Sequence, residues 1–254
     1  MRLSDDDREA LRYAKNLLEN PSLASKITNV IGVPIEKGFE LLREKWAEVV
    51  KGATRKSLET ALHVALITLD DKPQMQSWEI LHKLAIAATG AGGAFGLAGL
   101  PVELPVSTTI MLRSIAEIAR SEGERLQMPE VKLACLEVFA LGGRSTSDDA
   151  NESAYFVMRG ALSRSVSGAA KYMAEEGAPA IVMLITQLAA RFGVSVSEKV
   201  AAQAIPIIGA AGGAIINVLF IDHFQDMARG HFIVRRLERT YTPDLVREKY
   251  KRLK

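Results

Sequence analysis

Apolar residues return every three or four positions along most of the chain, which is the spacing of one face of an α-helix. In the first such segment an apolar stripe from Leu11 to Leu18 follows three acidic residues, and Asn20-Pro21 ends it. Acidic residues in a first turn and a proline after the last turn are typical helix boundaries. Alternation of apolar and polar residues, which would indicate strands, never extends beyond about five positions. The pattern therefore predicts an all-α fold.

Further helices are expected over residues 34–50, 55–69, 78–88, 129–141, 154–176, 178–192 and most of 197–254. The clearest loop is residues 142–151, which are rich in turn-forming residues. A chain of 254 residues is long enough to bury a sizeable core. We expect a compact multi-helix bundle in which an N-terminal helical region (1–75) and a helical core with a basic end (76–254) form one continuous domain.

Three segments are almost free of charge. Residues 84–112 contain a single ionisable side chain, Glu103, and residues 177–190 and 200–221 contain none. Two of them reach the roughly 18–20 residues that cross a bilayer as a helix. Their many glycines and prolines make them poor conventional spans, because strong insertion needs a high density of Leu and Ile.

The spacing of the glycines in two of these segments suggests close helix packing. Gly92 and Gly96 lie four residues apart, as do Gly209 and Gly213, so each pair shares one helix face. Small residues on one face let a second helix approach closely, in a membrane or in a core. We expect the two glycine-rich apolar helical segments to pack together.

Charge is unevenly distributed along the chain, although the formal net charge is only +2. Residues 229–254 hold nine Lys or Arg and three acids. Such a basic end can steer a protein to an anionic membrane surface. The expected membrane-binding residues are Arg235, Arg236, Arg239, Lys249, Lys251 and Arg252. The alternative is a solvated helix face paired around Glu238.

If Arg235, Arg236 and Arg239 are exposed, replacing them with Gln should not unfold the protein, because exposed charges contribute little to stability. The near-neutral net charge and an aromatic content of 6% argue against nucleic-acid binding.

Glu103 is a candidate site residue because it lies between two prolines at the start of an expected helix. A carboxylate there can bond free backbone N–H groups and complement the helix dipole. The alternative is a buried acid with a raised pKa, suited to proton transfer or metal binding.

A second cluster of polar residues follows the last uncharged segment. Asp222 and Asp226, and likewise His223 and Asp226, share a helix face. His231 follows eight residues after His223, so one metal ion can use both histidines only if the helix breaks between them. These four residues and Glu103 are the candidate ligands of a divalent metal, and Glu103, His223 and Asp226 the candidate catalytic residues. The alternative is that Asp226 pairs with a nearby arginine and the histidines bond backbone carbonyls, with no cofactor.

Other signals restrict the location and the reaction type. The sequence lacks a P-loop, a dinucleotide fingerprint after a strand and a nucleophile elbow. Its one cysteine, Cys135, lies in an apolar run and suits a reducing compartment. The acidic start contradicts a secretory signal. We expect a cytoplasmic protein, at the inner face of the cell membrane if it binds lipid.

Three runs of the sequence are similar to the EcsC protein family: residues 96–117 (GLAGLPVELPVSTTIMLRSIAE), 206–221 (PIIGAAGGAIINVLFI) and 222–241 (DHFQDMARGHFIVRRLERTY). The resemblance covers about residues 78–250. It implies a bacterial helical protein linked loosely to membranes, and it transfers no catalytic residue. The family takes its name from a gene beside a bacterial ABC-exporter operon, and it has no assigned catalytic mechanism.

Three functions remain open. The first is a peripheral, reversibly membrane-bound helical protein. The second is a metal-dependent hydrolase that uses Glu103, Asp222, His223, Asp226 and His231. The third is a soluble helical scaffold whose apolar runs form only its core. A mean hydropathy of +0.09 does not choose between them.

Overall fold

The structure is a computed structural model, and it describes residues 2–19, 22–42, 45–69, 99–142, 154–172, 178–205 and 209–253. These residues contain ten helices and no strand, which confirms the all-α prediction. The helices are α1 (Asp5–Glu19), α2 (Leu23–Ile31), α3 (Glu36–Leu41), α4 (Lys45–Thr68), α6 (Leu100–Ser121), α7 (Pro129–Leu141), α8 (Ala154–Lys171), α9 (Pro179–Gln203), α10 (Gly209–Thr240) and α11 (Pro243–Arg252).

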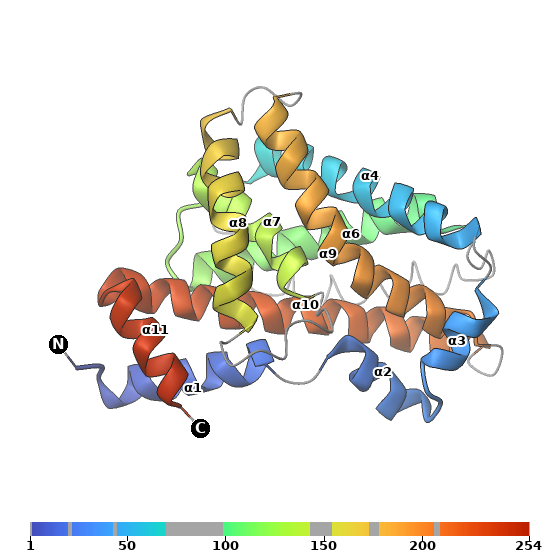
Figure 1. Cartoon of the computed structure of the whole chain (residues 1–254), viewed down its shortest axis with the longest axis horizontal. Helices are drawn as coiled ribbons and strands as arrows, with labels where there is room; N and C mark the ends of the chain where they lie inside the picture. The colour runs from blue at the N-terminus through green and yellow to red at the C-terminus, as the bar shows by residue number, and fades with distance from the viewer. Residues whose placement is uncertain are drawn as a thin grey trace.

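Helix α10, 32 residues long, runs through the bundle and packs against α1, α2, α6, α7, α9 and α11 (Figure 1). Four phenylalanines from three helices form the centre of the core. Phe220 and Phe224 of α10 lie against Phe192 of α9 and Phe139 of α7, with ring centroids 4.9–6.0 Å apart. All four are essentially inaccessible to solvent. Each buried aromatic side chain contributes on the order of 2–3 kcal/mol.

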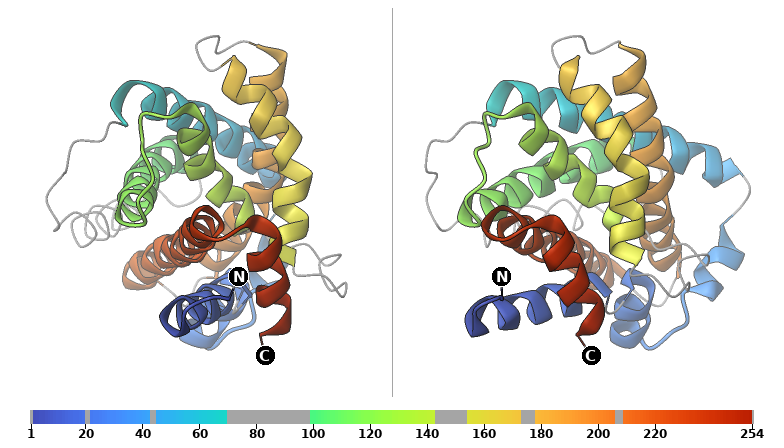
Figure 2. Two further views of the ribbon diagram at one scale, coloured as in Figure 1. Left: turned by 90° about the vertical axis from the view of Figure 1, so that its left-hand side faces the viewer. Right: turned by 60° about the vertical axis from the view of Figure 1, so that its left-hand side comes forward.

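Helices α8, α9 and α11 lie nearest the viewer in Figure 1 and on the right in the left-hand view of Figure 2. Helices α8 and α9 pack against each other and against α7. Helix α6 lies on the opposite side, and α4 packs against both α6 and α9. The N-terminal helices are therefore built into the same bundle as the rest of the chain.

Polar contacts join α1 to the C-terminal helices. The Tyr241 hydroxyl donates to Asp7 Oδ2 at 2.7 Å. The Lys15 ammonium donates to the carbonyl oxygens of Leu253 at 2.7 Å and Tyr250 at 3.3 Å. Lysine is well suited to this place, because the last carbonyls of a helix lack partners within the helix.

Several helix boundaries differ from the sequence-based prediction. The helix expected over 34–50 is divided, because the backbone of Leu42 is extended and ends α3. Its second half joins the helix expected over 55–69 to form α4. Helix α2 was not predicted. Helix α9 continues without a break through Gly193 and ends before Ile205, where the following Pro206 disfavours helical backbone.

The expected packing of the two glycine-rich segments involves residues that the structure does not describe. The predicted helix over 78–88, Gly92 and Gly96 lie outside the described residues. Of the second segment, Gly209 and Gly213 belong to the first two turns of α10, as the helical prediction requires.

Candidate functional site

Glu103 lies in the first turn of α6, as predicted. Its Oε1 accepts a hydrogen bond from Lys199 Nζ of α9 at 2.8 Å. The Lys199 side chain is completely buried, and that of Glu103 is 18% exposed. A buried ammonium needs a carboxylate partner. Glu103 therefore joins α6 to α9 in an ion pair.

Asp226 also takes part in ion pairs between helices. Its carboxylate accepts from Lys26 of α2 at 2.7 Å and from Arg229 of its own helix at 3.3 Å. The pairing with a nearby arginine is the alternative that the sequence left open. Asp222 lies one turn earlier on α10 and is partly exposed.

The two histidines of α10 are buried and contact different helices. His223 Nε2 donates to the carbonyl oxygen of Gly142 at 3.0 Å, as the alternative reading of the histidines predicted. His231 instead bonds a side chain, with Nδ1 3.0 Å from the Tyr155 hydroxyl of α8. Burial first, and then the charges of Arg159 and Arg235, hold the pKa of His231 well below its ordinary value of 6.5. His231 is therefore neutral.

Helix α10 does not break at Gly230, so His223 and His231 stay on separate turns. Gly230 is required for another reason. A Cβ atom there would lie 2.6 Å from Leu18 Cγ and 3.0 Å from the Ala14 carbonyl oxygen, so α1 crosses α10 at this point. Within the described part of the chain, no three His, Cys, Asp or Glu side chains are placed to hold a metal ion. Thus Glu103, Asp222, His223, Asp226 and His231 do not converge.

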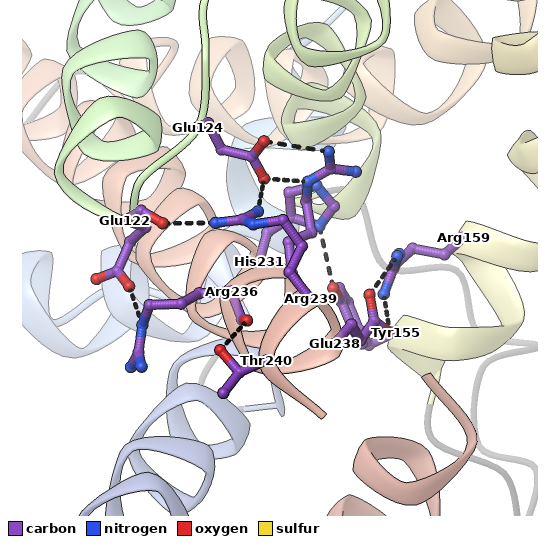
Figure 3. A network of polar contacts seen from close by, with 10 residues as sticks. Glu122, Glu124, Tyr155, Arg159, His231, Arg236, Glu238, Arg239 and Thr240 are labelled. Carbon is purple, nitrogen blue, oxygen red and sulfur yellow. Dashed lines mark hydrogen bonds and ion pairs between the residues drawn. The ribbon is translucent and has the colours of Figure 1, made fainter. Parts of the chain in front are cut away.

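Arg235, Arg236 and Arg239 form ion pairs with acids from other elements. Figure 3 shows Arg236 and Arg239 with Glu122 and Glu124. Glu124 accepts from Arg235 Nε at 2.7 Å and also from Arg239. Arg236 bonds Glu122 at 2.8 Å and Asp7 at 3.1 Å. These arginines do not form a freely solvated face paired around Glu238. The prediction that replacing all three with Gln leaves the protein folded assumed exposed side chains, and only Arg239 of the three is exposed.

The other three expected membrane-binding residues lie on α11. Arg252 bonds Glu248 at 3.0 Å, and Lys249 lies 3.9 Å from the same carboxylate. Lys251 and Arg252 are exposed. Helix α11 therefore presents Lys251 and Arg252 to solvent, whereas Arg235 and Arg236 of α10 are half-buried.

The sequence analysis did not identify Glu122, Glu124 and Arg159, which complete the network of ion pairs around α10. Arg159 of α8 bonds both carboxylate oxygens of Glu238, at 2.9 and 3.0 Å (Figure 3). Glu122 and Glu124 follow the end of α6 and lie more than a hundred positions before their partners. The one available signal was that α8 contains three basic residues and no acid, so its cations need partners on other elements.

A surface of different character lies on α8 and α9. We define the α8–α9 face as the exposed residues Val157, Arg164, Lys171, Tyr172, Val182 and Met183. Both helices pack on α7, so their exposed sides point away from it, toward the viewer in Figure 1. Met183 is 58% exposed and Val182 40%. Residues 179–190 of α9 are uncharged.

An apolar groove of about 470 Å³ lies between α9 and α4, and Thr186 in its lining is one helical turn beyond Val182 of this face. Val50, Ala189 and Val194 contribute apolar walls, and Lys51 and Arg55 are the cations that line it. Helix α9, 25 residues long, is the one helix among the described residues that is long and apolar enough to cross a membrane, and 39% of its apolar window is buried in the bundle.

No curated protein and no solved structure was found to match the chain. The family model described as the EcsC protein family matches residues 9–237. The match begins in α1, so it includes the N-terminal helices as well as the first two runs that resemble the family in the sequence and residues 222–237 of the third. Because the match covers most of the chain, this protein belongs to the EcsC protein family.

Proposed function

We propose that this protein is a peripheral membrane protein that attaches reversibly to anionic lipid through the α8–α9 face. The observation that carries the proposal is α9, a long apolar helix whose outer side is open to solvent. Large side chains such as Met183 and Val182 are exposed there. An exposed apolar surface on a folded protein often marks a site of interaction with a protein or a membrane.

The charges on the described residues of α8 and α9 favour an anionic surface. Helix α8 has no acidic residue, and Arg164 and Lys171 of this helix are exposed. Helix α9 has one acid, Glu198, near its C-terminal end. Each basic residue close to an anionic membrane contributes about 1 kcal/mol. This assignment moves the headgroup contacts from Arg235, Arg236 and Arg239 of α10 to α8, with the exposed cations of α11 as a second source.

The expected strength of attachment is modest. Burying one half-exposed large apolar side chain contributes about 1 kcal/mol, at roughly 25 cal/mol per Å². A few such side chains and a few cations give reversible binding, far from the nearly permanent insertion of a spanning helix. The groove between α4 and α9 offers an additional apolar surface, with Lys51 and Arg55 beside it.

Flotation with liposomes tests the proposal. Wild-type protein should float with vesicles that contain anionic lipid and should be released in part by high salt, because salt screens the charge contribution and leaves the apolar one. A double variant with Val182→Asp and Met183→Asp should lose binding about tenfold or more. Val30→Asp on α2 is the matched control, because Val30 is also an exposed valine, 53% accessible, but lies outside this face.

Three outcomes contradict the proposal. If Val30→Asp weakens binding as much as the double variant, the α8–α9 face is not the binding surface. Protein that never floats with any vesicles fits a scaffold without membrane attachment. Protein that resists both carbonate and high salt is integral.

A further inference from the structure

A second groove, of about 590 Å³, lies between α7, α8, α10 and α11. Its α8 wall runs from Phe156 to Lys171 at helical spacing, so the groove follows that helix for about four turns, or about 20 Å. The volume falls within the range of small-molecule sites. The groove does not coincide with the residues that the sequence singled out for chemistry.

Glu137 of α7 lines this groove, although its side chain is almost fully buried, with 6% of the residue accessible. Its carboxyl group makes no hydrogen bond or ion pair with any residue that the structure describes. Neither carboxyl oxygen is among the fully enclosed side-chain atoms that lack a partner, so the carboxyl is open to the groove. A molecule in the groove can therefore reach this carboxyl and donate hydrogen bonds to it.

The nearest cations of the protein are already engaged. Arg159 holds both oxygens of Glu238, and Arg235 bonds Glu124 at 2.7 Å. Their charges still act on Glu137, but burial dominates and raises the pKa of its carboxyl to about 7. Other charged and titratable groups line the same groove or interact with Glu137 electrostatically, and they come from four helices. They are Glu130 of α7, Tyr155, Arg159 and Lys171 of α8, Arg235 and Glu238 of α10, and Asp244 and Arg247 of α11.

The chemistry of the groove defines its ligand. An ionised carboxylate only accepts hydrogen bonds, so its complement is an N–H donor, and a charged donor gives the stronger bond. The ring of Phe156 adds an aromatic surface, and Val166 and Ala170 provide an apolar wall farther along α8. We propose that this groove binds a primary aliphatic amine, with its ammonium group on Glu137 and its hydrocarbon part along α8.

Two sources of such an amine are possible in a cell, a free amine and the ethanolamine headgroup of a phospholipid. Both present a primary ammonium group with three N–H donors. The inference does not depend on membrane attachment, because it rests on the unpartnered carboxyl and the groove alone.

Calorimetric titration with hexylamine tests the site, with hexyltrimethylammonium as the matched ligand that carries the same charge but no N–H donor. Wild-type protein should bind hexylamine at least about tenfold more tightly, since a charge-assisted hydrogen bond is lost with the second ligand. Glu137→Gln should abolish that preference. This variant keeps the side-chain shape and removes a buried ionisable group, so it is expected to fold. Glu59→Gln, at an exposed position on α4, should bind as the wild type does.

The pH profile provides an independent readout. The affinity for hexylamine should fall about tenfold for each pH unit below 7 and level off above it, because the ligand binds the ionised carboxylate. Glu137→Gln should show no such dependence. Gly160→Leu should also weaken binding, because Gly160 lines the groove and the space around its Cβ position is open.

Equal affinity for the two ligands, or unchanged hexylamine binding by Glu137→Gln, overturns the proposal. Flotation distinguishes the sources. If vesicles with phosphatidylethanolamine bind more protein than phosphatidylcholine vesicles, and Glu137→Gln removes the difference, the headgroup is the ligand. If hexylamine binds but the two kinds of vesicle do not differ, the ligand is a free amine.

Discussion

Replacing Glu124 with Gln should destabilise the protein by about 2–3 kcal/mol. The Glu124 side chain is 5% exposed and accepts hydrogen bonds from both Arg235 and Arg239. Breaking a buried ion pair costs about 3–5 kcal/mol when the remaining charge stays buried. Here the arginine side chains are 23% and 41% exposed, so water compensates part of the loss. Urea denaturation followed by far-UV circular dichroism should show a lower midpoint.

The control is Glu59→Gln, which breaks the Arg55–Glu59 pair of α4. That pair has a similar distance of 2.9 Å, but both side chains are about half exposed. Exposed pairs of this kind contribute less than about 0.5 kcal/mol. If the two variants lose the same stability, or if high salt removes the effect of Glu124→Gln, then the cluster around Glu124 is a solvated surface feature and our reasoning about it is wrong.

Three further changes follow from the same structure. Gly230→Ala should lower the free energy of unfolding by about 1–3 kcal/mol, and with it the thermal midpoint, because the added methyl group meets α1. Gly160→Ala, where the added methyl group meets open space, should raise the free energy of unfolding by about 0.5–1 kcal/mol. Equal effects of the two substitutions would refute the helix crossing. Glu103→Gln should lower the free energy of unfolding, measured by urea denaturation, by about 3 kcal/mol, because it leaves Lys199 buried and unpaired. Adding Lys199→Met should recover most of that loss. If the effects of the two substitutions simply add, the ion pair does not contribute as argued. The folded state keeps His231 neutral, so the stability that His231 contributes is present above pH 6.5 and is lost as the pH falls through its lowered pKa. His231→Phe should flatten the curve of stability against pH in this acidic range. An unchanged slope would assign the pH dependence to other groups.

The fold class was predictable because helical signals are local. The stripe from Leu11 to Leu18 identified α1, and all three of its buried residues belong to that stripe. The break at Leu42 was not predictable, since it depends on how α3 packs against α9. There a Cβ on Gly38 would lie 2.0 Å from the Ala201 carbonyl oxygen.

The candidate site was harder to predict, because its partners lie far apart in the sequence. The cluster of arginines in α10 was visible, but Glu122 and Glu124, which neutralise it, precede it by more than a hundred residues. Glu137 lies in an apolar run and gives no pattern of its own. Its importance arises only from what surrounds it, namely a groove and two arginines that are already paired.

The contacts of α1 with the C-terminal helices have a consequence for how the protein folds. Tyr241 bonds Asp7 across 234 positions, and Leu11, Ala14 and Leu18 are buried where α1 packs on α10. During synthesis α1 therefore emerges from the ribosome long before the helix that covers its apolar side. Contacts at such sequence separation are slow to form, because a long loop must close first. The apolar stripe of α1 stays uncovered in the nascent chain until α10 has been made, so chaperones have a long interval in which to bind it.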